Sequence, residues 1–220
     1  MSRSLLAAGC AAMMLLAAAP RATAQDGDIS VHAGLALSAA PEGQPLHRYS
    51  RPLHGLGIVM SVGVAGKVSS TTDLEGEVVL GTGISKRQQF SYNWTEDYIG
   101  QSRDQLFNIL VRSYVGQSRS FALVAGGGLA RMTYRTHSGV RTDPFLPGRP
   151  TSPLPDQQLT DWNLTLTGGV EGSLRITDRV SFAPTARVRW LRRPMEGGLP
   201  RTLGVSRYLY QFGAAVRLGL

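Results

Sequence analysis

Apolar and polar residues alternate along most of the chain, and residues 162–176 show the pattern most clearly. The even positions of this segment are apolar or glycine, from Trp162 through Leu166 to Ile176. The odd positions are polar, charged or glycine, and they include Thr165 and Glu171. A period of two is typical of a β-strand whose two faces meet different surroundings.

The same alternation predicts eight strands and no long helix. They cover residues 29–38, 56–68, 73–85, 104–115, 121–135, 162–176, 180–190 and 208–220. The fifth is the least certain in register, because Gly126, Gly127 and Gly128 could hold a bulge. Its alternation places Ala130 on an apolar face and Arg131 on a polar one.

The connections between these strands alternate between short and long. The short ones are residues 69–72, 116–120 and 177–179, and the long ones are 39–55, 90–103, 136–160 and 192–206. Tight turns at one end, long loops at the other and an even strand count are typical of outer-membrane barrels. Each strand is long enough to cross the hydrocarbon layer when tilted. The sequence therefore predicts an all-β fold, an eight-stranded antiparallel up-and-down transmembrane β-barrel.

The charged residues of the strands lie on the polar faces, which should line the bore of such a barrel while the apolar faces meet lipid. A soluble barrel would need apolar residues at its centre. Eight strands leave a bore that side chains fill, and unpaired buried charge is costly. We therefore expect an interior ion-pair network, against the alternative that these charges are solvated. Its predicted members are Glu75, Glu77, Glu171, Arg112, Arg131, Arg175, Arg187 and Arg189.

The first 24 residues form a predicted secretory signal. Arg3 precedes an apolar stretch, and a small-residue ending follows before Gln25. Cys10 weakly resembles a lipoprotein acceptor, but the apolar stretch before it is short. We expect cleavage after residue 24, which leaves residues 25–220 as one barrel domain without cysteine. No later apolar run has the length of a transmembrane helix.

The chain is basic, with 23 Lys and Arg against 15 Asp and Glu. Almost all the cations are arginines, whose forked guanidinium groups match carboxylates and phosphates. Arginines crowd the predicted loop end, where they would contact the phosphates of lipopolysaccharide or form a solvated rim. The residues predicted for this contact are Arg192, Arg193, Arg201 and Arg207. Export and the scatter of the arginines argue against nucleic-acid binding.

The signal sequence, the eight amphipathic strands over residues 28–220 and the glycine-rich fifth strand together resemble a family. They are similar to small outer-membrane barrels of the outer membrane protein A transmembrane-domain and outer membrane protein X type, including opacity-type adhesins. The resemblance implies a monomer in the cell outer membrane, in contact with outer-membrane lipid and inserted by the barrel-assembly machinery.

The residue pattern indicates neither a catalytic site nor a metal site. The four histidines show neither a catalytic triad nor a metal-ligand spacing, and His137 and Ser138, as neighbours, should point to opposite faces. We therefore expect no enzyme, no metal and no cofactor. Two functions remain open, a structural or surface-interaction protein and a narrow porin-like channel. Residues 136–160, rich in proline, are expected to have little local structure and to serve as an adhesive surface or merely as tolerated length.

Overall fold

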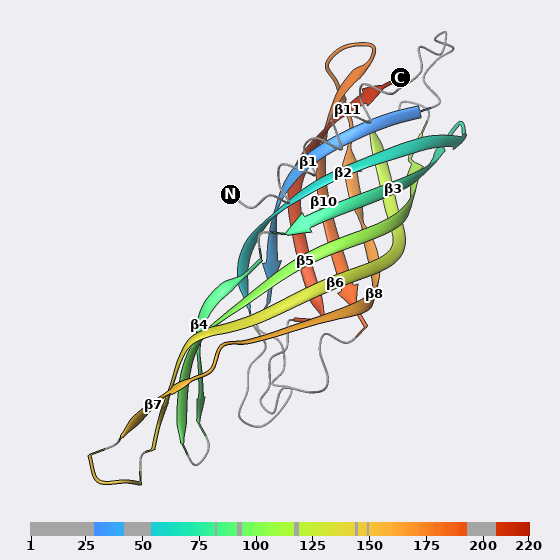
Figure 1. Ribbon diagram of the computed structural model, residues 1–220. Coiled ribbons are helices and arrows are strands. Elements are labelled where there is room, and N and C mark those ends of the chain that lie inside the picture. Colours follow the sequence, from blue (N-terminus) through green and yellow to red (C-terminus); the bar gives the residue numbers. More distant parts are fainter. Residues whose placement is uncertain are drawn as a thin grey trace.

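The computed structural model describes residues 29–41, 54–81, 83–91, 94–116, 119–143, 145–148, 150–192 and 206–220. Within these residues, eight long strands form a closed antiparallel ring (Figure 1). In ring order they are β1 (Ile29–Ala40), β2 (Gly55–Ser69), β3 (Thr72–Gly81), β5 (Thr95–Tyr114), β6 (Phe121–Thr142), β8 (Gln157–Gly172), β10 (Val180–Leu191) and β11 (Tyr208–Gly219). The last strand pairs with the first, from Ser30 opposite Gly219 to Ala39 opposite Tyr210. The predicted all-β, eight-stranded fold is confirmed.

Two ends of the ring differ. At the turn end lie the tight connections after β2, β5 and β8, together with the start of β1 and the end of β11. Two extra strands lie at the opposite end, the loop end (Figure 1). The extra strands there are β4 (Ser85–Ser91), which pairs with β5, and β7 (Thr151–Leu154), which pairs with β6. A two-residue strand, β9 (Leu174–Arg175), pairs with β10 at the turn end.

The loop end contains more strand than the sequence predicts. Most of residues 90–103 and 136–160, expected as loops, belongs to β4, β5, β6, β7 and β8. Strand pairing continues there, from Ser85 opposite Gln101 to Thr142 opposite Thr151. The prediction was wrong because it relied on alternation of apolar and polar residues. That signal fades where both faces of a sheet meet water.

The outer surface of the ring is apolar. Leu166, Val188 and Val216 point outward and are 58%, 39% and 51% exposed. Glu171 and Arg187, one residue out of phase with them along their strands, are buried inside the ring. Each backbone N–H and C=O along a closed ring has a partner strand, which a strand in hydrocarbon requires. The predicted assignment of faces, apolar outward and charged inward, is confirmed at these positions. Among the described residues no helix is long and apolar enough to cross a membrane.

One strand has the opposite orientation in its second half from the one predicted. In β6 the side chains of Ala130, Met132 and Tyr134 point into the bore and are almost fully buried, whereas Arg131 is exposed on the outside. The pairing of β6 with β8 runs without a shift through Gly126–Gly128, so no bulge occurs there. The apolar face of β6 was expected to meet lipid, as on the other strands, whose charged faces line the bore near the turn end. Near the loop end, however, apolar side chains line the bore.

Candidate functional site

The centre of the bore holds three glutamates. Glu75 and Glu77 alternate along β3, and Glu171 lies near the end of β8; all three are 3% exposed or less. Arg112 of β5 forms an ion pair with Glu75, and its Nε lies 3.2 Å from Oε1 of Glu171. One guanidinium therefore joins carboxylates from two strands that are not neighbours in the ring.

Two arginines of β10 complete the predicted part of the network. Nη1 of Arg187 donates to Oε1 of Glu77 at 2.6 Å, and its Nη2 lies 3.4 Å from Oε2 of Glu171. Nη2 of Arg189 donates to Oε2 of Glu77 at 3.2 Å. The structure thus brings together six of the eight residues that the sequence analysis selected. Their mutual pairing offsets the cost of burying so many charges.

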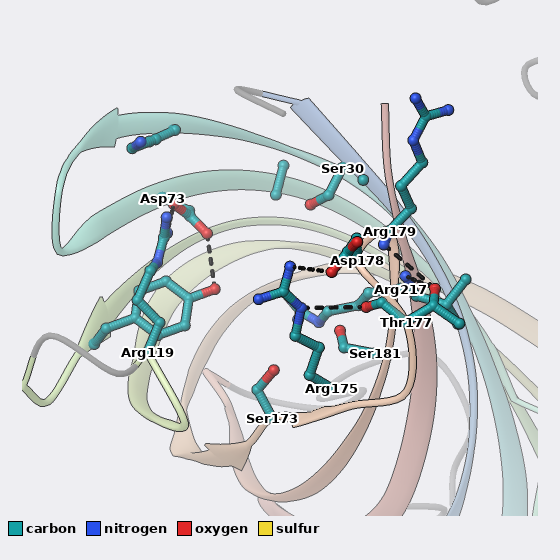
Figure 2. Close-up of a pocket in the computed structure, with 15 residues that line it drawn as sticks. Ser30, Asp73, Arg119, Ser173, Arg175, Thr177, Asp178, Arg179, Ser181 and Arg217 are labelled. Atoms are coloured by element: carbon teal, nitrogen blue, oxygen red, sulfur yellow. Dashed lines mark hydrogen bonds and ion pairs between the residues drawn. The ribbon is translucent and has the colours of Figure 1, made fainter. Parts of the chain in front are cut away.

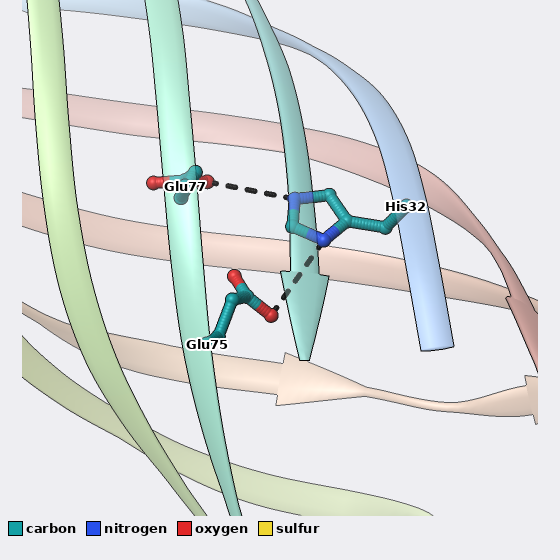
Figure 3. A group of neighbouring side chains, drawn as sticks. All are labelled: His32, Glu75 and Glu77. Atoms are coloured by element: carbon teal, nitrogen blue, oxygen red, sulfur yellow. Dashed lines mark ion pairs between the residues drawn. The ribbon is translucent and has the colours of Figure 1, made fainter. Parts of the chain in front are cut away.

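Arg217 and His32 belong to the same cluster but were not selected from the sequence. Nη2 of Arg217, on β11, lies 2.7 Å from Oε1 of Glu171. His32, on β1, lies between two carboxylates, with Nδ1 3.6 Å from Glu75 and Nε2 3.8 Å from Glu77 (Figure 3). Both residues lie on the polar faces of their strands, and this position could have identified them from the sequence as candidates for the cluster. We call these eight residues the bore network: His32, Glu75, Glu77, Arg112, Glu171, Arg187, Arg189 and Arg217.

Glycines make room for the large side chains of the network. A Cβ atom at Gly63 of β2 would lie 2.4 Å from Cε1 of His32 and 2.6 Å from the carbonyl oxygen of Gly76. A Cβ atom at Gly169 of β8 would lie 2.9 Å from Cγ of Arg187. Glycine inside a strand is typical of such close approach. Gly63 and Gly169 are the cross-strand partners of His32 and Arg187, so these glycines leave room for the large side chains of the neighbouring strands.

The trio of His32, Glu75 and Glu77 also has the geometry of a metal-ligand set, since one donor atom from each lies within 4.8 Å of the others. Arginines surround it, however. Arg112 and Arg217 contact Glu75, and further guanidinium groups contact Glu77. A cation would have to compete with these groups for the same oxygens, so the ion pairs account for the arrangement.

Arg131 and Arg175 lie outside the bore network, contrary to prediction. Arg131 is on the outer face of β6, opposite Trp162 of β8. Arg175 lies at the turn end, where its Nη2 donates to Oδ1 of Asp178 at 2.7 Å and its side chain is 71% exposed. Arg131 points outward because the second half of β6 has the opposite orientation from the one predicted. Arg175 lies beyond the end of β8, too close to the turn end to reach the bore network.

An apolar layer closes the bore on the loop side of the network. It is a cluster of buried side chains from seven of the eight ring strands, with one residue from the β3–β4 connection: Ala40, Val59, Val79, Ile84, Leu106, Ala130, Met132, Tyr134, Leu191 and Leu209. Tyr98 and Leu159 pack against it from the loop side. The two layers are stacked along the axis.

A small cavity lies where residues of the two layers meet. Its volume is about 20 Å³, and it lies beside Glu77, Arg187 and Arg189. That volume holds about one water molecule. A hydrated ion is much larger than one water molecule, so the space beside these three residues is too small for it, although polar atoms line it.

The loop-end rim carries two of the four residues predicted to contact lipopolysaccharide. Arg192 and Arg207 are exposed, and Trp190 lies opposite Tyr208 near them. The outer faces of β5 and β6 add three further exposed arginines that were not predicted for this contact: Arg103, Arg131 and Arg135. Arg193 and Arg201 lie outside the described residues, as does the predicted signal sequence.

His137 and Ser138 do not point to opposite faces, contrary to prediction. Ser138 has a φ of 53°, and Nδ1 of His137 lies 3.4 Å from Oγ of Ser138. The strand is irregular there, because the β5–β6 register shifts next to this pair. Both side chains are open to solvent, and among the described residues no carboxylate forms an ion pair with His137. The pair lacks the third group that orients a catalytic histidine.

Comparisons with known proteins find similarity in structure. No protein-family model matches the chain, and no curated protein sequence matches it. Among solved structures, the attachment invasion locus protein Ail of Yersinia pestis matches with a TM-score of 0.49 and 11% identity, over 88% of this chain and 100% of that one. Neisserial surface protein A matches with 0.44 and 14%, over 88% and 97%. OprG of Pseudomonas aeruginosa matches with 0.47 and 11%, over 88% and 97%.

These likenesses concern the fold. The strand ring, its apolar outer surface and its charged bore are properties of the chain itself. By the eight-stranded antiparallel ring that its described residues form, the chain is a small antiparallel β-barrel.

Proposed function

We propose that this chain spans the outer membrane as a closed barrel that does not conduct, and that it serves a structural and surface-interaction role. The outward side chains of the ring support the location. Ile109, Leu166 and Phe212 are all more than half exposed, on three different strands. So much apolar surface is unfavourable in water but suits the acyl chains of a bilayer.

The filled bore carries the proposal of a closed barrel. An ion-pair layer and an apolar layer occupy the axis one above the other, and a solute on its way through would meet both. Passage would require several buried charges to separate and an apolar cluster to open. The alternative of a narrow porin-like channel has no comparable support.

Planar-bilayer recording tests this proposal. We expect no discrete openings from the purified protein at 100 mV, whereas a 16-stranded porin inserted from the same detergent should give stepwise currents. Insertion is checked separately by protection of the strands from protease. Regular single-channel steps from inserted protein would show that the bore is open and would contradict the proposal.

The loop end supplies a rigid surface for partners outside the cell. Arg141 of β6 donates from Nη2 to Oε1 of Glu96 on β5 at 2.7 Å, and its guanidinium lies over the ring of Trp94. Beyond this contact, Phe145 and Leu146 are exposed in the connection between β6 and β7. The β6–β7 hairpin projects from the loop end (Figure 1). Exposed apolar side chains on a rigid strand extension favour protein contact, which supports an adhesive role better than tolerated length.

The exposed arginines at the same end support contact with lipopolysaccharide. Replacement of Arg192, Arg193 and Arg207 by glutamine should reduce the lipopolysaccharide that copurifies with the protein by about fivefold, which corresponds to about 1 kcal/mol for exposed charge contacts. The phosphates of lipid A would lose forked donors. Gel electrophoresis of the purified protein with a stain for lipopolysaccharide measures the effect, because this stain does not count phosphates bound elsewhere.

Arg175→Gln is the control for this experiment, because it removes a charge from the turn end instead. Its lipopolysaccharide content should equal that of the wild type. Equal content in the triple variant would exclude these arginines as the contact. Insertion by the barrel-assembly machinery and a monomeric state complete the proposal.

A further inference from the structure

The turn end of the barrel contains a cavity that the surface role does not use. Its volume is about 370 Å³, and it is lined by the ends of several strands and by residues 173–181 (Figure 2). This size is within the range of small-molecule sites in proteins. We call it the turn-end vestibule. Its floor is Arg217 of the bore network.

Cations dominate the lining. Among the described residues that line the vestibule, the cations are Lys67, Arg119, Arg175, Arg179 and Arg217, and the carboxylates are Asp73 and Asp178. Five positive groups against two negative ones give a local excess of three charges. Field lines in such a recess concentrate, which raises the local concentration of anions.

Ion pairs hold two of the arginines in place on opposite sides. Arg119 pairs with Asp73, which also accepts a hydrogen bond from the hydroxyl of Tyr114 at 2.8 Å. Across the vestibule, Arg175 uses Nε and Nη2 for contacts with Thr177 and Asp178 (Figure 2). These contacts leave Nη1 of Arg175 available as a donor. Arginines fixed in this way lose little freedom when a ligand binds.

Arg217 adds a buried cation to the wall of the vestibule. Its side chain is only 8% exposed, and its Nη2 lies 2.7 Å from Oε1 of Glu171. The bore network therefore holds this guanidinium in place, and its positive charge adds to the attraction for an anion in the vestibule. Hydroxyl groups of Ser30, Ser173 and Ser181 lie nearby as further donors.

We propose that the turn-end vestibule binds a small solute that carries two linked phosphate groups. The excess of three positive charges matches the charge of such a group, and guanidinium groups on two sides can each hold one phosphate by forked hydrogen bonds. The vestibule lies within the end of the strand ring, so a soluble phosphate can enter from the aqueous side. A phosphate-bearing lipid headgroup has the same chemistry, and the experiment below separates the two sources.

Isothermal titration with inorganic pyrophosphate tests the proposal, with the protein extracted from membranes into dodecyl maltoside at low salt. The wild type should bind one pyrophosphate saturably. The double variant Arg119→Gln with Arg175→Gln should bind at least about tenfold more weakly, since two charge-assisted contacts are lost. The matched control, Lys86→Gln with Arg87→Gln, removes the same charge from β4 at the loop end and should bind like the wild type.

Folding of each variant is checked by its heat-modifiable gel mobility. Absence of saturable binding in the folded wild type, or equal affinities of the two double variants, would overturn the proposal. A second titration uses nanodiscs containing phosphatidylglycerol. Binding equal to that in maltoside identifies a soluble phosphate as the occupant, whereas competition by the lipid identifies a headgroup in the same site.

Discussion

Replacement of Glu77 by glutamine is expected to lower the free energy of unfolding by about 3–5 kcal/mol. Glutamine keeps the shape of the side chain but removes the charge that Arg187 and Arg189 share. The positive charges of these two buried guanidinium groups would then be only partly neutralised. Urea titration followed by heat-modifiable gel mobility measures the change.

Asp178→Asn is the control, because Asp178 also pairs with an arginine but is 95% exposed. An exposed ion pair contributes little, so this variant should be within about 1 kcal/mol of the wild type. If Glu77→Gln is as stable as Asp178→Asn, the bore network is not a determinant of stability.

Introduction of a charge on the outer face should produce the second large effect. Leu166→Arg is expected to cost about 2–4 kcal/mol of folding free energy in bilayers, because the guanidinium would lie in hydrocarbon. Leu166 is 58% exposed, so the same substitution in water would cost little. Urea-dependent folding into vesicles measures the loss.

Leu146→Arg is the control, because it introduces the same charge at an exposed position that is expected to lie in water instead of lipid. Leu146 is 51% exposed, close to the value for Leu166, but it lies in the connection between β6 and β7. The variant should fold like the wild type. Equal losses for both variants would contradict the membrane location of the outer face.

The fold could be predicted because each spanning strand separates two different solvents. Val188 alternates with Arg187 and Arg189, and this contrast reveals both the strand and its lipid face. The contrast is lost where both faces resemble each other. In β6, Ala130 and Met132 join an apolar layer inside the bore, and the loop-end parts of the strands carry mostly polar residues on both faces. The errors in the orientation of β6 and in loop length lie in these two regions.

The members of the bore network were harder to predict than the fold. The strand face of a residue can be read from the sequence, but its height along the axis depends on how strands are staggered around the ring. Arg187 reaches Glu77 across a separation of 110 residues, and Arg217 reaches Glu171 from another strand. Arg175 continues the alternation of Glu171 beyond the end of β8, in β9, yet it lies too near the turn end to join them.

Quenching by brominated lipids tests the central claim most directly, namely that the apolar rows face acyl chains and the ionic groups face the bore. A bimane label would be placed on single cysteines at Leu166, Val188 and Val216, and at the inward neighbours Thr165 and Thr167, in a Cys10→Ser background. Strong quenching by bromine in mid-chain at the first three positions, and weak quenching at the last two, is the predicted result. Strong quenching at Thr165 and Thr167 with protection of Leu166, Val188 and Val216 would contradict the account.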